Sequence, residues 1–282
     1  MSAVDVFEAV WLWLRQPLEY GFMRHALVAV LLVGGVGGLA STFTVVRGTA
    51  FFADALAHAV LPGVAVAYLV AGAGSAALFW GALAAALVAS AATHAVAREG
   101  HVREETAIGV VMAAALALGV AIISTRRAYA VDLTHVLFGD LLGVGPADLV
   151  RTASLAAAAT ALVLVLWRPM AIVAFDPVLA VTLRLPVGWL QYALLALVAL
   201  TTVLALQTVG ATMTLALLVT PGAAARLVAR TLGEMAALSV GVAVIGSVAG
   251  LYLSYYLAIP SGPAIVLALT AAFAALRVVA RR

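Results

Sequence analysis

The stretch ETAIGVVMAAALALGVAIIS, residues 105–124, begins with one acidic residue and then contains no charged residue to its end. An α-helix needs about 20 predominantly apolar residues to cross the hydrocarbon core of a bilayer, which is about 30 Å thick. Inside lipid the backbone N–H and C=O groups must be paired within the segment, and an α-helix pairs them. Residues 106–124 are therefore predicted to form a membrane-spanning helix.

Apolar runs of this length recur along the whole chain. Of its 282 residues, 66% are hydrophobic and 10% are charged, and the mean hydropathy is +1.20, whereas about 25% of the residues in an ordinary soluble domain are charged. The sequence predicts an all-α fold, a polytopic transmembrane helix bundle of about nine spans. The predicted spans are 25–46, 51–70, 76–97, 106–124, 150–167, 189–206, 211–225, 235–257 and 263–280.

The number of crossings depends on segment 211–225, which is short and contains Pro221. Between eight and ten crossings are consistent with the sequence, because span boundaries read from sequence are uncertain by several residues. Residues 1–24 are expected to form an interfacial N-terminal lead-in. Residues 25–282 are expected to form a single transmembrane domain.

The chain carries 15 basic residues, all of them Arg, and it contains neither Lys nor Cys. The missing Lys excludes the phosphate-binding loop that many ATPases use, and the missing Cys excludes thiolate metal sites. The Arg residues are scattered at span ends instead of forming a patch for nucleic acid. If the protein uses ATP, a separate chain must bind the nucleotide.

The Arg residues fall mainly in every second link between spans. The positive-inside rule assigns these links, and the C-terminus with them, to the cytoplasm. With nine spans the N-terminus then lies outside. The links without Arg, on the opposite side, are 71–75, 207–210 and 258–262. Five Arg residues depart from the pattern: Arg15, Arg24, Arg126, Arg127 and Arg151.

Two ionisable residues interrupt the second predicted span, FFADALAHAVLPG at residues 51–63. Asp54 and His58 are four residues apart, which places them on one face of a helix. A carboxylate inside a span costs roughly 2.5–3.5 kcal/mol on insertion scales and by default indicates a functional site. Pro62, one turn further on, kinks the helix and frees a backbone carbonyl.

Three interpretations of this pair stay open on spacing alone. The carboxylate and the imidazole could bind a metal ion, guard a pathway, or hydrogen-bond to each other and serve only helix packing. As ligands they suit Zn²⁺, Mn²⁺ or Fe²⁺ held weakly enough to leave. Twofold association would supply a second pair and could complete the coordination sphere.

Two links between spans carry further signals. Segment 129–148 contains Asp132, His135 and Asp140 and is either a candidate outer gate or a solvated connection. The link at 168–188 contains the pair Asp176-Pro177, in which Asp is a good N-cap and Pro suits the first turn of a helix. A short capped helix near 175–187 is therefore predicted, either for docking into a partner or as a plain connector.

Six segments spread along the chain form an ordered set. They are ADALAHAVLPGVAVA (53–67), ETAIGVVMAAALALGVAIIS (105–124), VDLTHVLFGDLLGVGPADL (131–149), AFDPVLAVTLRLPVG (174–188), LLVTPGAAARLVA (217–229) and LSYYLAIPSGPAIVL (253–267). In this order they resemble the permease (membrane) subunit of ATP-binding-cassette (ABC) importers for zinc, manganese and iron ions.

The resemblance implies a homodimeric, multi-pass permease of the bacterial inner membrane. Its implied partners are two cytoplasmic ATP-binding-cassette ATPase subunits and an extracytoplasmic metal-binding protein. The chain itself would not be an enzyme and would hold no permanent cofactor, because the divalent metal ion is the transported substrate. Asp54 and His58 match the acid and the imidazole that the family associates with the metal pathway.

The resemblance also implies a coupling helix that transmits ATPase motion. The matching residues are Asp176, Pro177, Leu179, Ala180, Leu183, Arg184 and Pro186. Two positions depart from the family pattern, which usually has Gly where this chain has Arg184 and commonly has an acid where it has Val178. The departures leave the docking role intact and affect the detailed contacts.

Other functions are compatible with the same residues. A proton-coupled secondary metal transporter could use Asp54 and His58 as a proton relay. A membrane scaffold could use the pair only to fix helix packing. A permease for iron chelates would share the ATPase-coupled design but need a larger cavity. The identity of the metal is also open, because the general affinity order of divalent metals does not select one.

Overall fold

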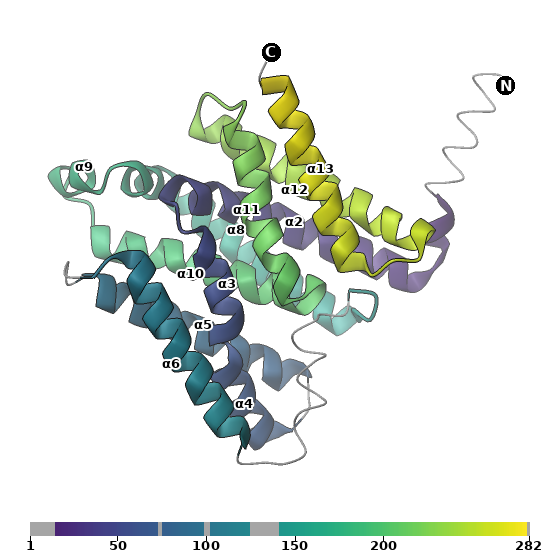
Figure 1. Cartoon of the computed structure of the whole chain (residues 1–282), viewed down its shortest axis with the longest axis horizontal. Helices are drawn as coiled ribbons and strands as arrows, with labels where there is room; N and C mark the ends of the chain where they lie inside the picture. Colours follow the sequence, from purple (N-terminus) through teal and green to yellow (C-terminus); the bar gives the residue numbers. More distant parts are fainter. Residues whose placement is uncertain (1–14, 73–74, 99–101, 125–140, 281–282) are drawn as a thin grey trace.

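The computed structural model describes residues 15–72, 75–98, 102–124 and 141–280. Within these residues there is no β-strand, and the predicted all-α fold is confirmed. The helices, drawn in Figure 1, are η1 (Gln16–Glu19), α2 (Gly21–Arg47), α3 (Ala50–Ala59), α4 (Leu61–Ala71), α5 (Ser75–Arg98), α6 (Glu104–Ser124), α8 (Pro146–Phe175), α9 (Pro177–Thr182), α10 (Val187–Val209), α11 (Ala211–Arg226), α12 (Leu232–Leu257) and α13 (Ser261–Ala280).

Eight helical segments among the described residues are long and apolar enough to cross a membrane, with α3 and α4 together forming one of them. The seventh predicted span, 211–225, corresponds to α11, which is not among these eight. Its 16 residues extend about 24 Å at 1.5 Å per residue, less than the roughly 30 Å of a hydrocarbon core. Of the predicted lead-in 1–24, residues 1–14 lie outside the described residues, and α2 already begins at Gly21.

The short helix α11 returns the chain to the end of the bundle where α2 ends. Gly222 N–H donates to Ser41 Oγ at 2.8 Å, and Arg226 Nη1 donates to the carbonyl of Val45 at 3.4 Å. Pro221 has no N–H and interrupts the hydrogen-bond ladder of α11 just before Gly222. The Ser41 hydroxyl on α2 is therefore the hydrogen-bond acceptor for the Gly222 N–H, which directly follows this proline.

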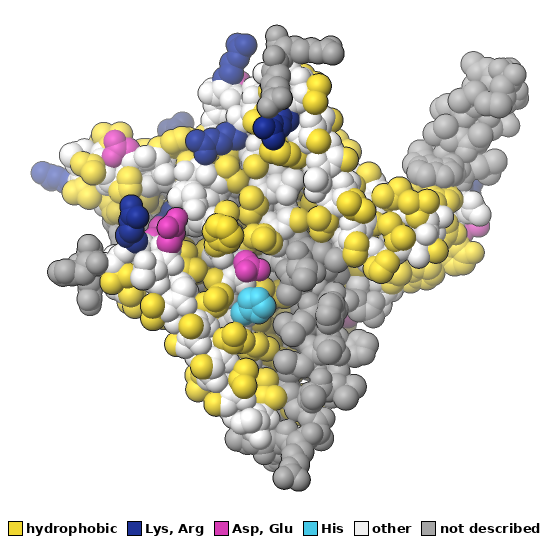
Figure 2. Space-filling view, viewed as in Figure 1, with side chains coloured by type: hydrophobic (Ala, Val, Ile, Leu, Met, Phe, Trp, Pro, Cys, Tyr) yellow, Lys and Arg dark blue, Asp and Glu magenta, His cyan; other side chains and the backbone are white. Residues whose placement is uncertain are grey.

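Several Arg-bearing links gather at one end of the bundle. Arg47 pairs with Glu104, which joins the end of α2 to the start of α6. Val46, Phe175 and Arg226 border one pocket, which joins the ends of α2, α8 and α11. Figure 2 shows arginine side chains over this end, from α9 to the C-terminal part of α13. The assignment of this end to the cytoplasm stays a prediction.

The helix α2 is the centre of one half of the molecule, where it packs against α8, α10, α11 and α12. Gly38 lies so close to the backbone of Val240 that a Cβ would not fit. The Ser239 hydroxyl donates to the Gly38 carbonyl at 2.7 Å. Close backbone contact of this kind is how helices associate in lipid, where burial of apolar surface gives little driving force.

The helices α3 to α6 form the other half, seen at the lower left of Figure 1. In it, α4 and α5 cross at Gly63 and Gly81, where a Cβ on either residue would overlap the backbone of the other. Both α10 and α11 contact α3 as well as α2. The helix with the predicted acid and imidazole is thus packed where the two halves meet.

Candidate functional site

The polar side chains of α3 lie on the one stripe of that helix that is not buried. From Phe51 to Val60, Phe51 is exposed, Asp54 and His58 are half-buried, and every other side chain is buried. The spacing i, i+3, i+7 follows the helical repeat, so the three side chains share a face. The structure thus brings Asp54 and His58 together on the open side of a helix whose other sides are covered.

A break in the helix follows directly after His58. The helix α3 ends at Ala59, and α4 begins at Leu61 with Pro62 in its first turn. The kink predicted at Pro62 is confirmed. Because Pro62 has no N–H, it cannot donate to the carbonyl of His58, four residues earlier. The backbone N–H at the C-cap of α3, Val60, is directed to this carbonyl and to that of Leu56 instead.

The Asp54 carboxylate and the His58 imidazole are not joined by a hydrogen bond. Among the residues that the structure describes, neither side chain has a hydrogen-bond or ion-pair partner. The interpretation of the pair as an internal hydrogen bond that serves packing is therefore not supported. Ionisable groups inside a protein are normally paired or bind a ligand, so these two are available for a ligand.

One copy of the chain supplies few ligands to a metal ion. Within the described ranges, the structure has no group of three or more His, Cys, Asp or Glu side chains that could hold one. One acid and one imidazole form an incomplete coordination sphere for a transition metal. The arrangement is suited to an ion in passage or to a site completed from elsewhere.

A salt bridge fixes the link between α2 and α3. Arg47 Nη2 donates to both carboxylate oxygens of Glu104, at 2.6 and 2.9 Å, and the Arg47 side chain is only 11% exposed. The two residues are 57 positions apart in sequence. Sequence reasoning missed this pair, since nothing local to either residue indicates it. It ties the end of α2, which directly precedes α3, to the start of α6.

The short capped helix predicted near 175–187 is present as α9, Pro177–Thr182, and its coupling role stays a prediction. The Asp176 carboxylate caps it, accepting from the backbone N–H groups of Val178 and Leu179 at 2.9 Å each. Leu183 follows as the C-cap, and Pro186 precedes α10 directly. The turn between α8 and α10 is thus held by its own hydrogen bonds, as the Asp-Pro signal predicts.

The end of α9 explains one departure from the family pattern. Arg184 has φ of 55°, a left-handed conformation. Leu185 N–H bonds to the Ala180 carbonyl and Arg184 N–H to the Val181 carbonyl, which together form a Schellman motif. Glycine is the residue that takes this position without strain. Arg184 therefore occupies, at a conformational cost, a position that glycine would take without strain.

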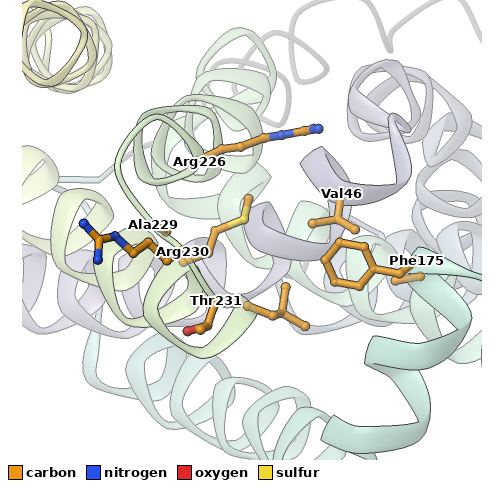
Figure 3. A pocket seen from close by; sticks show the side chains of 9 residues that line it. Val46, Phe175, Arg226, Ala229, Arg230 and Thr231 are labelled. Carbon is orange, nitrogen blue, oxygen red and sulfur yellow. The ribbon is translucent and has the colours of Figure 1, made fainter. Parts of the chain in front are cut away.

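The surface of α9 is mainly apolar and exposed. Val178, Val181 and Leu183 are more than half exposed, whereas Ala180 is fully buried against the bundle. A pocket of about 260 Å³ lies beside it, with Val46 and Phe175 on one side and Arg230 and Thr231 on the other, as Figure 3 shows. An exposed apolar ridge rimmed by charge is typical of a protein interaction site.

The candidate outer gate cannot be placed in the structure. Asp132, His135 and Asp140 lie outside the described residues. Asp148, which follows them, accepts from the backbone N–H of Gly145 at 3.2 Å and pairs with Arg151 at 3.3 Å. Asp148 thus stabilises the first turn of α8 by bonding back to the N-cap residue Gly145.

Comparisons with known proteins match this arrangement over nearly its whole length. The sequence profile of the ABC 3 transport family matches residues 19–280. The manganese transport system membrane protein MntC of Halalkalibacterium halodurans is 39% identical over 92% of this chain and 87% of its own length. The chelated iron transport system membrane protein YfeD of Yersinia pestis is 33% identical over 90% and 84%.

A solved structure agrees with the fold. PsaBC from Streptococcus pneumoniae, solved in complex with Fab, superposes with a TM-score of 0.81 at 32% sequence identity. The match covers 95% of this chain and 95% of the matched chain. The helical arrangement described above is therefore shared with a chain of PsaBC.

Proposed function

The chain belongs to the ABC 3 transport family, and we propose that it is the membrane-spanning subunit of an ATP-driven importer for a divalent transition-metal cation. The observation that supports this most is the unpaired Asp54 and His58 on the open stripe of α3. The names of the relatives include manganese and chelated iron. The substrate class proposed here is Mn²⁺, Fe²⁺ or Zn²⁺, which carboxylate and imidazole ligands suit.

Asp54 and His58 form part of the metal pathway in this proposal. They lower the cost of removing water from the cation during its passage, and they release it because two side chains hold it weakly. A second copy of the chain, related by a twofold axis, brings a second acid and imidazole. The proposed working unit is thus a homodimer with the stripes of α3 facing the path.

In this proposal the energy for transport comes from ATP hydrolysis by other chains. The chain has no Lys and so lacks the lysine that ATPases place on the phosphates of ATP. Two ABC ATPase subunits dock on α9 at the Arg-rich end, which faces the cytoplasm, and their closure reorients the spans. An extracytoplasmic binding protein delivers the metal at the opposite end, where Asp132, His135 and Asp140 form the candidate gate.

Uptake by reconstituted vesicles tests the proposal. The chain is assembled with its ATPase subunits in sealed vesicles, and metal entry is followed with and without ATP. We expect entry that requires ATP and the ATPase subunits. Entry that continues without an ATPase and collapses with the proton gradient would instead identify a secondary transporter. Competition between Mn²⁺, Fe²⁺, Zn²⁺ and an iron chelate then identifies the substrate.

A further inference from the structure

A groove separates α8 from α12 on the surface of α2. Both helices pack on α2 but make few contacts with each other, so α2 forms the floor between them. The cavity in this groove measures about 680 Å³, and all of its lining residues belong to α2, α8 and α12. Binding sites for small molecules have volumes of roughly 300–1,000 Å³, so the groove is large enough for a ligand.

The lining of the groove changes from apolar to cationic along its length. Leu39, Leu164 and Val165 contribute apolar walls, and the side chains of Leu164 and Val165 are 67% and 78% exposed. Trp167 and Arg168 lie at the other end of the α8 wall. The Trp167 ring is held edge-on against Phe43 with 5.5 Å between ring centroids. The groove thus has an amphipathic wall that is open to its surroundings.

The depth of Arg168 matches the level of lipid headgroups. With 30 residues, α8 is about 45 Å long and exceeds the roughly 30 Å hydrocarbon core. Arg168 is the first charged residue of α8 after Arg151, and it directly follows Trp167, a side-chain type that favours the membrane interface. Arg168 therefore lies where the hydrocarbon ends, on the Arg-bearing side of the bundle.

We propose that this groove binds an anionic diacyl phospholipid of the cytoplasmic leaflet. One acyl chain lies between α8 and α12 against Leu39, and the phosphodiester lies beside the Arg168 guanidinium. Basic pockets between transmembrane helices on the cytoplasmic side are suited to anionic headgroups. Arg226 and Arg230 line the neighbouring pocket at the ends of α2, α8, α11 and α12, and they add positive charge at this end. The assignment to the cytoplasmic leaflet rests on the membrane orientation given in the proposed function. The binding of an anionic phospholipid in the groove does not depend on that orientation.

Native mass spectrometry of the full chain tests the proposal without any transport measurement. The delipidated protein is titrated with phosphatidylglycerol and, separately, with phosphatidylcholine that has the same acyl chains. Two variants act on the site: Arg168→Gln removes the charge, and Gly233→Trp fills the groove. The Cβ position of Gly233 has no described heavy atom within 4 Å, so the indole enters open space.

Two matched controls separate the groove from general effects. Gly241 lies on the same helix and also has no described heavy atom within 4 Å of its Cβ position, so Gly241→Trp adds the same indole elsewhere. Arg277 is exposed on α13 at the same end of the bundle, so Arg277→Gln removes the same charge elsewhere. Size-exclusion profiles check that all four variants are folded.

We expect phosphatidylglycerol to bind the parent more tightly than phosphatidylcholine. Arg168→Gln should weaken phosphatidylglycerol binding about fivefold, the change for one Arg near an anionic lipid surface. Gly233→Trp should weaken it at least about tenfold, and both controls should bind like the parent. Equal binding of the two lipids, or binding that survives both groove substitutions, overturns the proposal. So does loss of the lipid when the ATPase subunits assemble, because the occupant is then a protein.

Discussion

Two pairs of ionisable residues lie near the link between α2 and α3. They differ in whether the fold supplies a partner for each charged group. Arg47 and Glu104 are joined by a salt bridge of 2.6 Å across α2 and α6. Asp54 and His58, on the adjoining α3, are half-buried and have no partner among the described residues. The first pair is satisfied by the fold, and the second is left to be satisfied by something else.

This difference between paired and unpaired groups predicts which residues contribute to stability and which to function. A polar group that has its partner inside the protein contributes to folding, and its removal leaves the other partner unsatisfied. A polar group without a partner contributes little to folding, so its removal should leave stability unchanged. If this contrast holds, satisfied groups should show their effect in unfolding and unsatisfied groups in metal transport.

The largest effect is expected from the unpaired residues. Asp54→Ala and His58→Ala should each lower metal uptake by about tenfold or more, because even indirect supports of a metal site account for about 10–100-fold in affinity. The melting temperature of the purified protein should stay near that of the parent, since no described hydrogen bond is lost. Uptake at the parental rate in both variants would show that the pair has no role in the pathway.

The paired residues should show the opposite result. Glu104→Gln removes the negative charge that forms the salt bridge with the largely buried Arg47 side chain. This loss should lower the free energy of unfolding by about 1.5–3 kcal/mol. Thermal unfolding in detergent measures this loss, and Glu105→Gln is the control because Glu105 is exposed on the same turn. Uptake per folded complex should remain close to that of the parent. A loss of uptake without any loss of stability would reverse the contrast.

A smaller effect is expected at α9, where the Asp176 carboxylate is satisfied by two backbone N–H groups. Asp176→Ala should lower the stability of this turn by about 1 kcal/mol. Hydrogen exchange at the amides of Val178 and Leu179 should become faster. Asp176→Asn keeps an accepting oxygen and should retain most of the protection. If the alanine variant exchanges as slowly as the parent, the cap does not hold this helix.

The smallest effect is expected at Arg184, where the cost is conformational. Arg184→Gly should stabilise the end of α9 by about 1 kcal/mol or less, because glycine adopts the left-handed conformation without strain. The amide of Leu185, which bonds to the carbonyl of Ala180, should exchange more slowly. Faster exchange at Leu185 would show that the arginine side chain contributes more than its backbone costs.

Much of the fold is predictable from the sequence because the physical signals are local. Apolar length gives most spans to within a few residues, although the span predicted at 150–167 extends to Phe175. Pro62 gives the break after α3, and Asp176-Pro177 gives the start of α9. The salt bridge of Arg47 with Glu104 is not predictable in this way, because its partners come from distant segments. The left-handed Arg184 is not predictable from its type, since Arg rarely adopts it.

The candidate site is only half predictable for a similar reason. The four-residue spacing of Asp54 and His58 places both on one face, and the structure agrees. Spacing cannot distinguish two side chains that bond to each other from two that stay apart, because that depends on rotamers and on the neighbouring helices. Within the described residues the structure shows that the two side chains do not bond to each other, and their role as metal ligands stays a prediction.

Pulsed electron paramagnetic resonance of bound Mn²⁺ tests the central claim most directly. The permease–ATPase complex, without the binding protein, is loaded with Mn²⁺ and examined for coupling to an imidazole ¹⁴N nucleus. The account predicts coupling in the parent, its loss in His58→Gln, and its retention in His94→Gln, where a histidine at the Arg-bearing end of α5 is removed. Coupling that persists in His58→Gln, or its absence in the parent, would contradict direct contact between this imidazole and the ion.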